Sequence, residues 1–135
     1  MPEFSAKSKA RLLSCHPDLQ RLFNEVIKWR DCTILVGHRG KEGQDEACRG
    51  GFSQLRWPGS KHNHKPSLAV DVMPYFSCEP HIRWQDELST REFVGYVMAT
   101  ADQLGIKIRN GGDWDLDLDF YDQSFFDLPH FELVK

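Results

Sequence analysis

The sequence of 135 residues lacks several features that would place a chain in a common class of protein. It has no apolar run long enough to span a membrane, and residues 1–9 lack the apolar core of a secretory signal peptide. It has no C-x-x-C pair, which argues against a zinc ribbon, and its four cysteines are too widely spaced to indicate a disulfide framework. We therefore expect free thiols, synthesis in a reducing cytoplasm and no membrane anchor.

The chain also lacks an excess of positive charge, since 17 Lys and Arg are set against 20 Asp and Glu, a formal net charge of −3. Such a balance provides no general attraction for nucleic acid, so we expect no nucleic-acid partner. No internal repeat, low-complexity tract or linker divides the sequence. We expect one monomeric domain over residues 1–135, large enough to bury roughly two thirds of its unfolded surface, with residues 1–14 forming a loose start.

Two main helices are predicted from apolar periodicity. The first begins at Pro17, which suits a first helical turn, and carries an apolar stripe to a point near Arg30. The second begins with the capping box Ser89-x-x-Glu92 and ends at Gly105. A shorter helical turn is expected over residues 44–48, inside a long loop over residues 40–59.

Strands are predicted over residues 33–37, 68–73, 106–109 and 130–134, where short apolar or alternating runs follow turns. Pro129 supports the last of these, because the residue before a proline is disfavoured in the helical region. The fold class predicted from these elements is α+β: a small, mostly antiparallel sheet packed with two main helices.

Polar groups with metal-binding chemistry gather in two stretches. The stretch from Ser60 contains His62 and His64 and ends in Asp71, which lies within an apolar strand; the second contains Asp127 and His130. A carboxylate on such a strand needs a partner, either a metal or an arginine, because burying it unpaired is costly. Two histidines and one carboxylate are a common ligand set for catalytic Zn²⁺, with a fourth position left open.

These residues resemble the M15 zinc peptidases, a family that includes D-alanyl-D-alanine carboxypeptidases and bacteriophage L-alanyl-D-glutamate endopeptidases. The resemblance extends from about residue 16 to residue 135. It is carried by four motifs: Ser60-Lys61-His62, Pro66-Ser67-Leu68-Ala69-Val70-Asp71-Val72, Gly111-Gly112-Asp113-Trp114 and Pro129-His130-Phe131-Glu132-Leu133. It implies the fold shared by hedgehog signalling domains and D-Ala-D-Ala peptidases.

The resemblance implies His62, Asp71 and His130 as ligands of one zinc ion, and Asp127 as the catalytic acid and base. His62 precedes Asp71 by nine residues, whereas many family members have a spacing of seven, which would select His64. We favour His62 because it lies in the Ser-x-His motif, and we keep His64 as the alternative ligand.

The implied mechanism is zinc-assisted amide hydrolysis, in which Asp127 accepts a proton from water and passes it to the leaving amine. Arg39, which follows a predicted strand, is a candidate to bind a substrate carboxylate or the developing oxyanion; its alternative role is a structural salt bridge, for example with Asp113. Glu132 shares a strand face with His130 and could orient that ligand. The alternating acidic residues over 113–119 could bind Ca²⁺, although a solvated acidic loop is the favoured interpretation.

The function implied by the resemblance is that of a phage endolysin: a zinc endopeptidase that cuts the L-alanyl-D-glutamate bond of peptidoglycan stem peptides. It would be made in the host cytoplasm and would reach the wall through a membrane lesion made by a separate protein. One alternative is a D-alanyl-D-alanine carboxypeptidase or dipeptidase. Another is a non-catalytic, zinc-containing wall-binding module, against which the presence of Asp127 argues.

Overall fold

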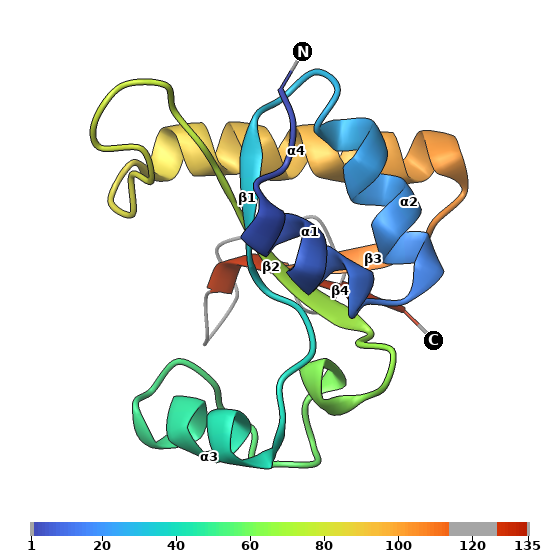
Figure 1. Ribbon diagram of the computed structural model, residues 1–135, viewed down its shortest axis with the longest axis vertical. Coiled ribbons are helices and arrows are strands. Elements are labelled where there is room, and N and C mark those ends of the chain that lie inside the picture. The colour runs from blue at the N-terminus through green and yellow to red at the C-terminus, as the bar shows by residue number, and fades with distance from the viewer. Residues whose placement is uncertain (1, 114–126, 135) are drawn as a thin grey trace.

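The computed structural model describes residues 2–113 and 127–134, and these form an α+β fold, as the sequence predicted (Figure 1). The helices are α1 (Ala6–Leu13), α2 (Pro17–Val26), α3 (Lys41–Arg49) and α4 (Glu87–Leu104), with a short 3₁₀ helix, η1 (Lys61–Asn63). The strands are β1 (Cys32–Val36), β2 (Ala69–Pro74), β3 (Ile108–Gly111) and β4 (Asp127–Leu133).

The four strands form one antiparallel sheet in the order β1-β2-β4-β3. The last strand in the chain, β4, therefore lies between β2 and β3. Its register with β2 places His130 opposite Asp71. Side chains from stretches almost sixty residues apart in the sequence meet at this position because neighbouring residues on paired strands face one another closely.

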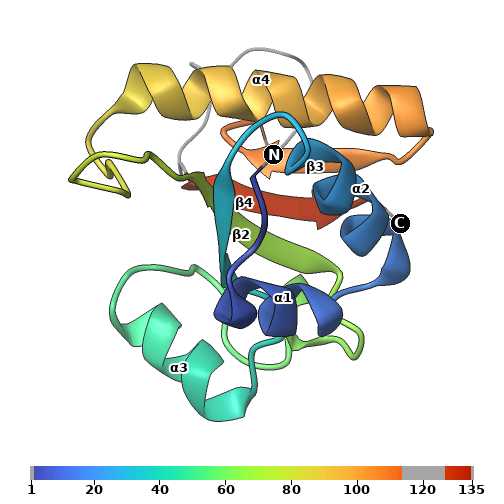
Figure 2. The same ribbon diagram turned by 45° about the horizontal axis from the view of Figure 1, so that its top comes forward.

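The core lies between the sheet and the helices α2 and α4. The predicted stripe of α2 is buried, and its Phe23 packs edge-on against Phe131 of β4 with ring centroids 5.6 Å apart. Along α4 the buried apolar side chains are Phe93, Val94, Val97 and Ala101. In both views the strands lie between α4 and α3, so the two helices are on opposite sides of the sheet (Figure 2).

The prediction of a loose start was wrong. Ser5 caps α1 by accepting a hydrogen bond from the amide of Ser8. The buried Ser8 hydroxyl then accepts from the amide of Ile34, which joins α1 to β1. Phe4 and Leu12 are both buried, so the helix is held by its own cap and by the core, although eight residues are too few for a stable isolated helix.

Several predicted boundaries also differ from those in the structure. The helix α4 begins two residues before Ser89, because Asp86 is its cap and accepts a hydrogen bond from the Ser89 amide. The helix α3 is a full nine residues rather than a short turn. The helix α2 ends at Val26, and the chain continues to Arg30 in turns.

The strand β4, which carries His130, begins earlier than predicted. β4 begins at Asp127 and includes Pro129, and its pairing with β3 is interrupted between Asn110 and Gly111. Proline cannot donate to a sheet ladder and is tolerated at such irregularities. Sequence periodicity gives no sign of the interruption, so the prediction started β4 only after the proline.

Candidate active site

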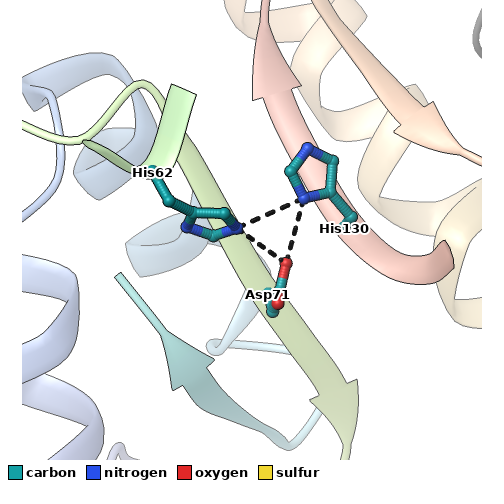
Figure 3. Close-up of side chains that lie close together, drawn as sticks. All are labelled: His62, Asp71 and His130. Atoms are coloured by element: carbon teal, nitrogen blue, oxygen red, sulfur yellow. Dashed lines mark hydrogen bonds and ion pairs between the residues drawn. The ribbon is translucent and has the colours of Figure 1, made fainter. Parts of the chain in front are cut away.

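The side chains of His62, Asp71 and His130 converge on one point, as Figure 3 shows. His62 comes from η1, whose first turn is fixed by reciprocal hydrogen bonds between Ser60 and Asn63. Asp71 and His130 come from the facing positions of β2 and β4. The structure thus brings together the three residues that the sequence singled out as ligands.

The spacing of the three ligand atoms suits a small metal ion. His62 Nε2 lies 3.1 Å from Asp71 Oδ1 and 3.3 Å from His130 Nδ1, and His130 Nδ1 lies 3.1 Å from the same Asp71 oxygen. Ligands about 2.0–2.1 Å from a tetrahedral zinc ion would lie roughly 3.3 Å from each other. The triangle therefore matches one face of a tetrahedron, with the fourth corner left for water or substrate.

The orientation of each imidazole is fixed by the nitrogen that points away from the cluster. His62 Nδ1 lies 2.8 Å from the carbonyl oxygen of Gly37, and His130 Nε2 lies 2.8 Å from Glu132 Oε1. Because each outer nitrogen faces an acceptor, it carries the proton in the neutral ring. His62 Nε2 and His130 Nδ1 are then left with free lone pairs aimed at the centre of the cluster.

Glu132, two residues after His130, pairs with three basic side chains. Besides His130, its carboxylate contacts Arg109 at 2.8 Å and Lys61 at 3.4 Å. Burial raises the pKa of Glu132, but the hydrogen bond from His130 and the charges of His130 and Arg109 outweigh it and lower that pKa to about 2. Glu132 is thus an anion that ties β4 to β3 and to the residue preceding His62.

The cluster itself is charged in the absence of metal. Burial works to raise the pKa of Asp71, yet hydrogen bonds from His130 and His62 hold it well below its usual range. Burial likewise opposes the charged form of His130, but Asp71 and Glu132 raise its pKa to about 9. A metal ion that binds here must displace the proton from His130. The buried Asp71 carboxylate would then have a metal ion as its partner in place of a protonated histidine.

Asp127 lies at the start of β4, three residues before His130. Burial raises its pKa to about 6, and the negative charge of Asp71 adds to that rise, while His130 and Arg39 oppose it. A carboxyl group with a pKa near neutrality is suited to exchange protons with a substrate.

The position of Asp127 depends on Asn110, which the sequence analysis did not select, and on Gly111, which it named only as part of a family motif. The buried amide of Asn110 donates to the carbonyl oxygens of Leu128 (2.7 Å) and His130 (2.9 Å). It therefore spans the irregular stretch of β4. At Gly111 a Cβ atom would lie 2.0 Å from the carbonyl oxygen of Asp127, so only glycine fits. A lone Asn-Gly pair after a strand indicates a turn in sequence and gives no hint of this role.

Arg39 lies beside the cluster, with its guanidinium 3.7 Å from Asp71 Oδ2. It also donates to Gln44 Oε1 at 3.1 Å. Gln44 is fully buried in α3, and it was not predicted to matter, because a single glutamine in a polar helix carries no sequence signal. Arg39 thus forms a salt bridge, as the alternative role proposed, but its partner in the structure is Asp71 rather than the suggested Asp113.

Two further predictions concern residues outside the cluster. His64 is exposed and does not join the three ligand atoms, so the geometry favours His62 over its alternative. Most of the proposed Ca²⁺ loop, residues 114–119, lies outside the described residues; Asp113, at its start, is buried.

Comparison with known proteins agrees with this picture. Residues 2–134 match the family model described as phage L-alanyl-D-glutamate peptidase. The L-alanyl-D-glutamate peptidase of Escherichia phage T5 is 29% identical over 137 aligned positions, which cover 98% of both chains. Among solved structures, the L-Ala D-Glu endopeptidase ChiX of Serratia marcescens is similar with a TM-score of 0.74 and 26% identity, covering 98% of this chain and 90% of that one.

Proposed function

The chain belongs to the phage L-alanyl-D-glutamate peptidase family, and from that premise we propose that it is a zinc endopeptidase of peptidoglycan. Its substrate would be the bond between L-alanine and D-glutamate in the stem peptides, and its role would be lysis of the host cell. The observation that carries the proposal is the tetrahedral face formed by His62, Asp71 and His130; Asp127 begins the strand that carries His130, and its charge interacts with those of Asp71 and His130.

The donor set fits zinc in particular. Imidazole nitrogen and carboxylate oxygen are ligands that zinc accepts in four-coordinate catalytic sites, and three protein ligands leave one position for chemistry. Zinc held by these residues would act as a Lewis acid toward the scissile carbonyl and toward water. Ca²⁺ and Mg²⁺ fit less well, because both require more oxygen ligands than this cluster offers.

The chain's own groups then perform the proton transfers. Asp127, with its raised pKa, accepts a proton from the attacking water and later delivers it to the nitrogen of the departing D-glutamate. Arg39, held by Asp71 and Gln44, presents a fixed positive charge beside the cluster. It is placed to bind a carboxylate of the substrate or the negative charge that develops on the carbonyl oxygen.

The proposal includes a route to the substrate. Within the part of the chain that the structure describes, no helix is long and apolar enough to cross a membrane. We propose that the protein accumulates in the host cytoplasm as a monomer and reaches the wall once a separate protein has permeabilised the membrane.

Digestion of purified peptidoglycan, followed by mass spectrometry of the fragments, tests the bond and the metal together. New amino-terminal D-glutamyl or D-isoglutaminyl ends are expected with the zinc-loaded protein, and none with Asp127→Ala or after chelation. Release of free D-alanine instead would assign the protein to the carboxypeptidases. Zinc binding without any cleavage would leave a non-catalytic wall-binding module.

A further inference from the structure

Charge is distributed unevenly along the chain. The sequence carries 20 Asp and Glu, yet none lies between Glu46 and Asp71. That interval contains four cationic side chains: Arg49, Arg56, Lys61 and Lys65. A protein with a net charge of −3 thus has a long stretch, residues 47–70, whose charged side chains are all positive, and this stretch contains the proposed ligand His62.

Part of this stretch also exposes large apolar side chains to solvent. Three large apolar side chains within six residues are exposed: Phe52 (77%), Leu55 (50%) and Trp57 (41%). Arg49 and Arg56 are exposed beside them, and neither forms an ion pair within the described residues. We call residues 49–57 the cationic loop. Exposed aromatic groups interleaved with unpaired cations are typical of a binding surface rather than of a solvated loop.

The cationic loop is fastened to the candidate active site by Gln44. The side-chain nitrogen of Gln44 donates to the carbonyl oxygen of Leu55 (2.6 Å) and to the hydroxyl of Ser53 (2.9 Å). Its side-chain oxygen accepts from Arg39, which in turn pairs with Asp71. The fully buried amide of Gln44 thus has hydrogen-bond partners for both its nitrogen and its oxygen. A satisfied buried network of this kind holds its side chains in a single arrangement.

The same amide joins the loop to η1. Gln44 Oε1 also accepts from Asn63, the residue after His62, at 3.3 Å. The loop and α3 lie on the side of the sheet opposite α4 (Figure 2). Whatever binds the cationic loop is therefore held at a fixed position relative to the ligand cluster.

We propose that the cationic loop is a peptidoglycan-binding surface that holds the polymer next to the scissile bond. This inference rests on the proposed function and names a substrate contact beyond the catalytic groups. Arg49 and Arg56 would pair with stem-peptide carboxylates, of which D-glutamate supplies one that is not part of the scissile bond. Trp57 and Phe52 would stack on the faces of the sugar rings, whose C–H groups form apolar patches that suit aromatic side chains.

Anionic phospholipid is the other polyanion with apolar surface that such a loop could bind. Because Gln44 fixes the cationic loop next to the ligand cluster, we favour peptidoglycan over phospholipid as the partner. A membrane lying against the cationic loop would lie against the adjacent ligand cluster as well, and would keep the polymeric substrate away from it. Binding of the wall at the same place would bring the substrate to the cluster.

The test is co-sedimentation of the zinc-loaded protein with purified, lipid-free sacculi, in an Asp127→Ala background that leaves the polymer intact. We compare the parent with Arg49→Glu/Arg56→Glu and with Trp57→Ser. The matched controls are Arg21→Glu and Trp29→Ser, which change exposed residues of the same types on α2 and just after it. Melting temperature and zinc affinity are measured for every variant to show that the fold and the ligand cluster are intact.

Binding by the double charge reversal should be at least about tenfold weaker at low salt, because attraction is replaced by repulsion at two exposed positions. It should lose most of the salt dependence seen in the parent. Trp57→Ser should weaken binding at every salt concentration, and the two controls should bind as the parent does.

Parent-like binding by both loop variants would overturn the proposal, as would failure of the parent to bind sacculi. Binding to anionic vesicles in preference to sacculi would overturn it in favour of a membrane surface. Cleavage is read separately, with Asp127 restored: a wild-type protein that binds through the loop but never cuts peptidoglycan refutes the proposed endopeptidase and leaves the wall-binding surface standing.

Discussion

Glu132 Oε1 accepts a hydrogen bond from His130 Nε2 at 2.8 Å, which turns the other nitrogen of that ring toward His62 and Asp71. The same carboxylate is held by Arg109 and Lys61. Glu132 therefore decides which nitrogen of His130 can bind a metal, without being a ligand itself.

Replacing Glu132 should weaken zinc binding. We expect Glu132→Ala to lower zinc affinity about 10–100-fold, the usual cost of losing a partner that orients a ligand. Glu132→Gln should reduce zinc affinity by less, because the carbonyl oxygen of the glutamine can still accept a hydrogen bond from His130. Competition with a chromophoric chelator measures the affinity. Glu87→Gln, on the exposed start of α4, is the control, and an equal loss there would contradict the orienting role.

The two histidines of the His62-Asn63-His64 stretch should differ in their effect on zinc-dependent stability. Zinc at about 100 times its dissociation constant should stabilise the parent by roughly 2.7 kcal/mol. His62→Ala should abolish the rise in melting temperature, whereas His64→Ala should keep it, because His64 is exposed and outside the cluster. Calorimetry with and without zinc checks both. The opposite pattern would make His64 the ligand.

Asp127→Asn should separate catalysis from metal binding. Loss of a general base costs about 10²–10⁴-fold in rate, so kcat should fall by that factor while zinc affinity changes little. A similar fall in zinc affinity would instead place Asp127 among the ligands. Digestion of soluble muropeptides measures kcat, and chelator competition measures the affinity.

Asp127 should also give the metal-free protein a distinctive pH dependence. Its pKa is raised in the fold from 3.8 to about 6, so the folded state binds this proton more tightly than the unfolded state does. The stability that this proton supplies is complete below pH 3.8 and is lost as the pH rises through about 6. Denaturant unfolding should show Asp127→Asn gaining stability relative to the parent across that interval. A constant difference would contradict the raised pKa.

Gly111→Ala should disturb the site from a distance. The added methyl group would meet the Asp127 carbonyl oxygen at 2.0 Å, so β4 must shift. We expect a loss of about 1–3 kcal/mol in unfolding free energy and a fall in kcat, since Asp127 moves. Gly95→Ala in α4 is the control: nothing lies within 4 Å of its Cβ, and alanine should stabilise the helix by about 0.5–1 kcal/mol.

Gln44→Leu should loosen the cationic loop. The substitution removes the buried oxygen that accepts from Arg39 and Asn63, and it leaves Arg39 with Asp71 as its partner; this loss costs about 1–3 kcal/mol in unfolding free energy. It also frees Ser53 and Leu55, so limited proteolysis within residues 49–57 should become faster. Gln54→Leu, in the same loop but exposed, should change neither quantity. Equal sensitivity of the two variants would contradict the fastening role of Gln44.

The residues of the candidate site were visible in the sequence because their types are rare in their surroundings. Asp71 stands out in an apolar strand, and His130 follows a proline near a second strand. The fold class and the family resemblance were confirmed by the structure and the comparisons. The ligand roles of His62, Asp71 and His130 and the catalytic role of Asp127 stay predictions that the geometry supports.

What could not be predicted depends on tertiary contacts. Gln44 and Asn110 have no local signature, because each matters only through the backbone groups that folding brings around it. The cap of α4 was misplaced because Asp86 and Ser89 are both good capping residues, and sequence alone cannot choose between them. The helix α1 is short, and burial of Phe4 and Leu12 against distant segments stabilises it.

The order of the strands has a consequence for synthesis of the protein. β4 follows β2 and β3 in the chain, yet it occupies an inner place between them and supplies both His130 and Asp127. A nascent chain in which β4 is not yet synthesised exposes two unpaired strand edges and lacks one proposed metal ligand, His130, and the proposed proton carrier, Asp127. The candidate site is therefore assembled only after β4 has been synthesised and has inserted between β2 and β3.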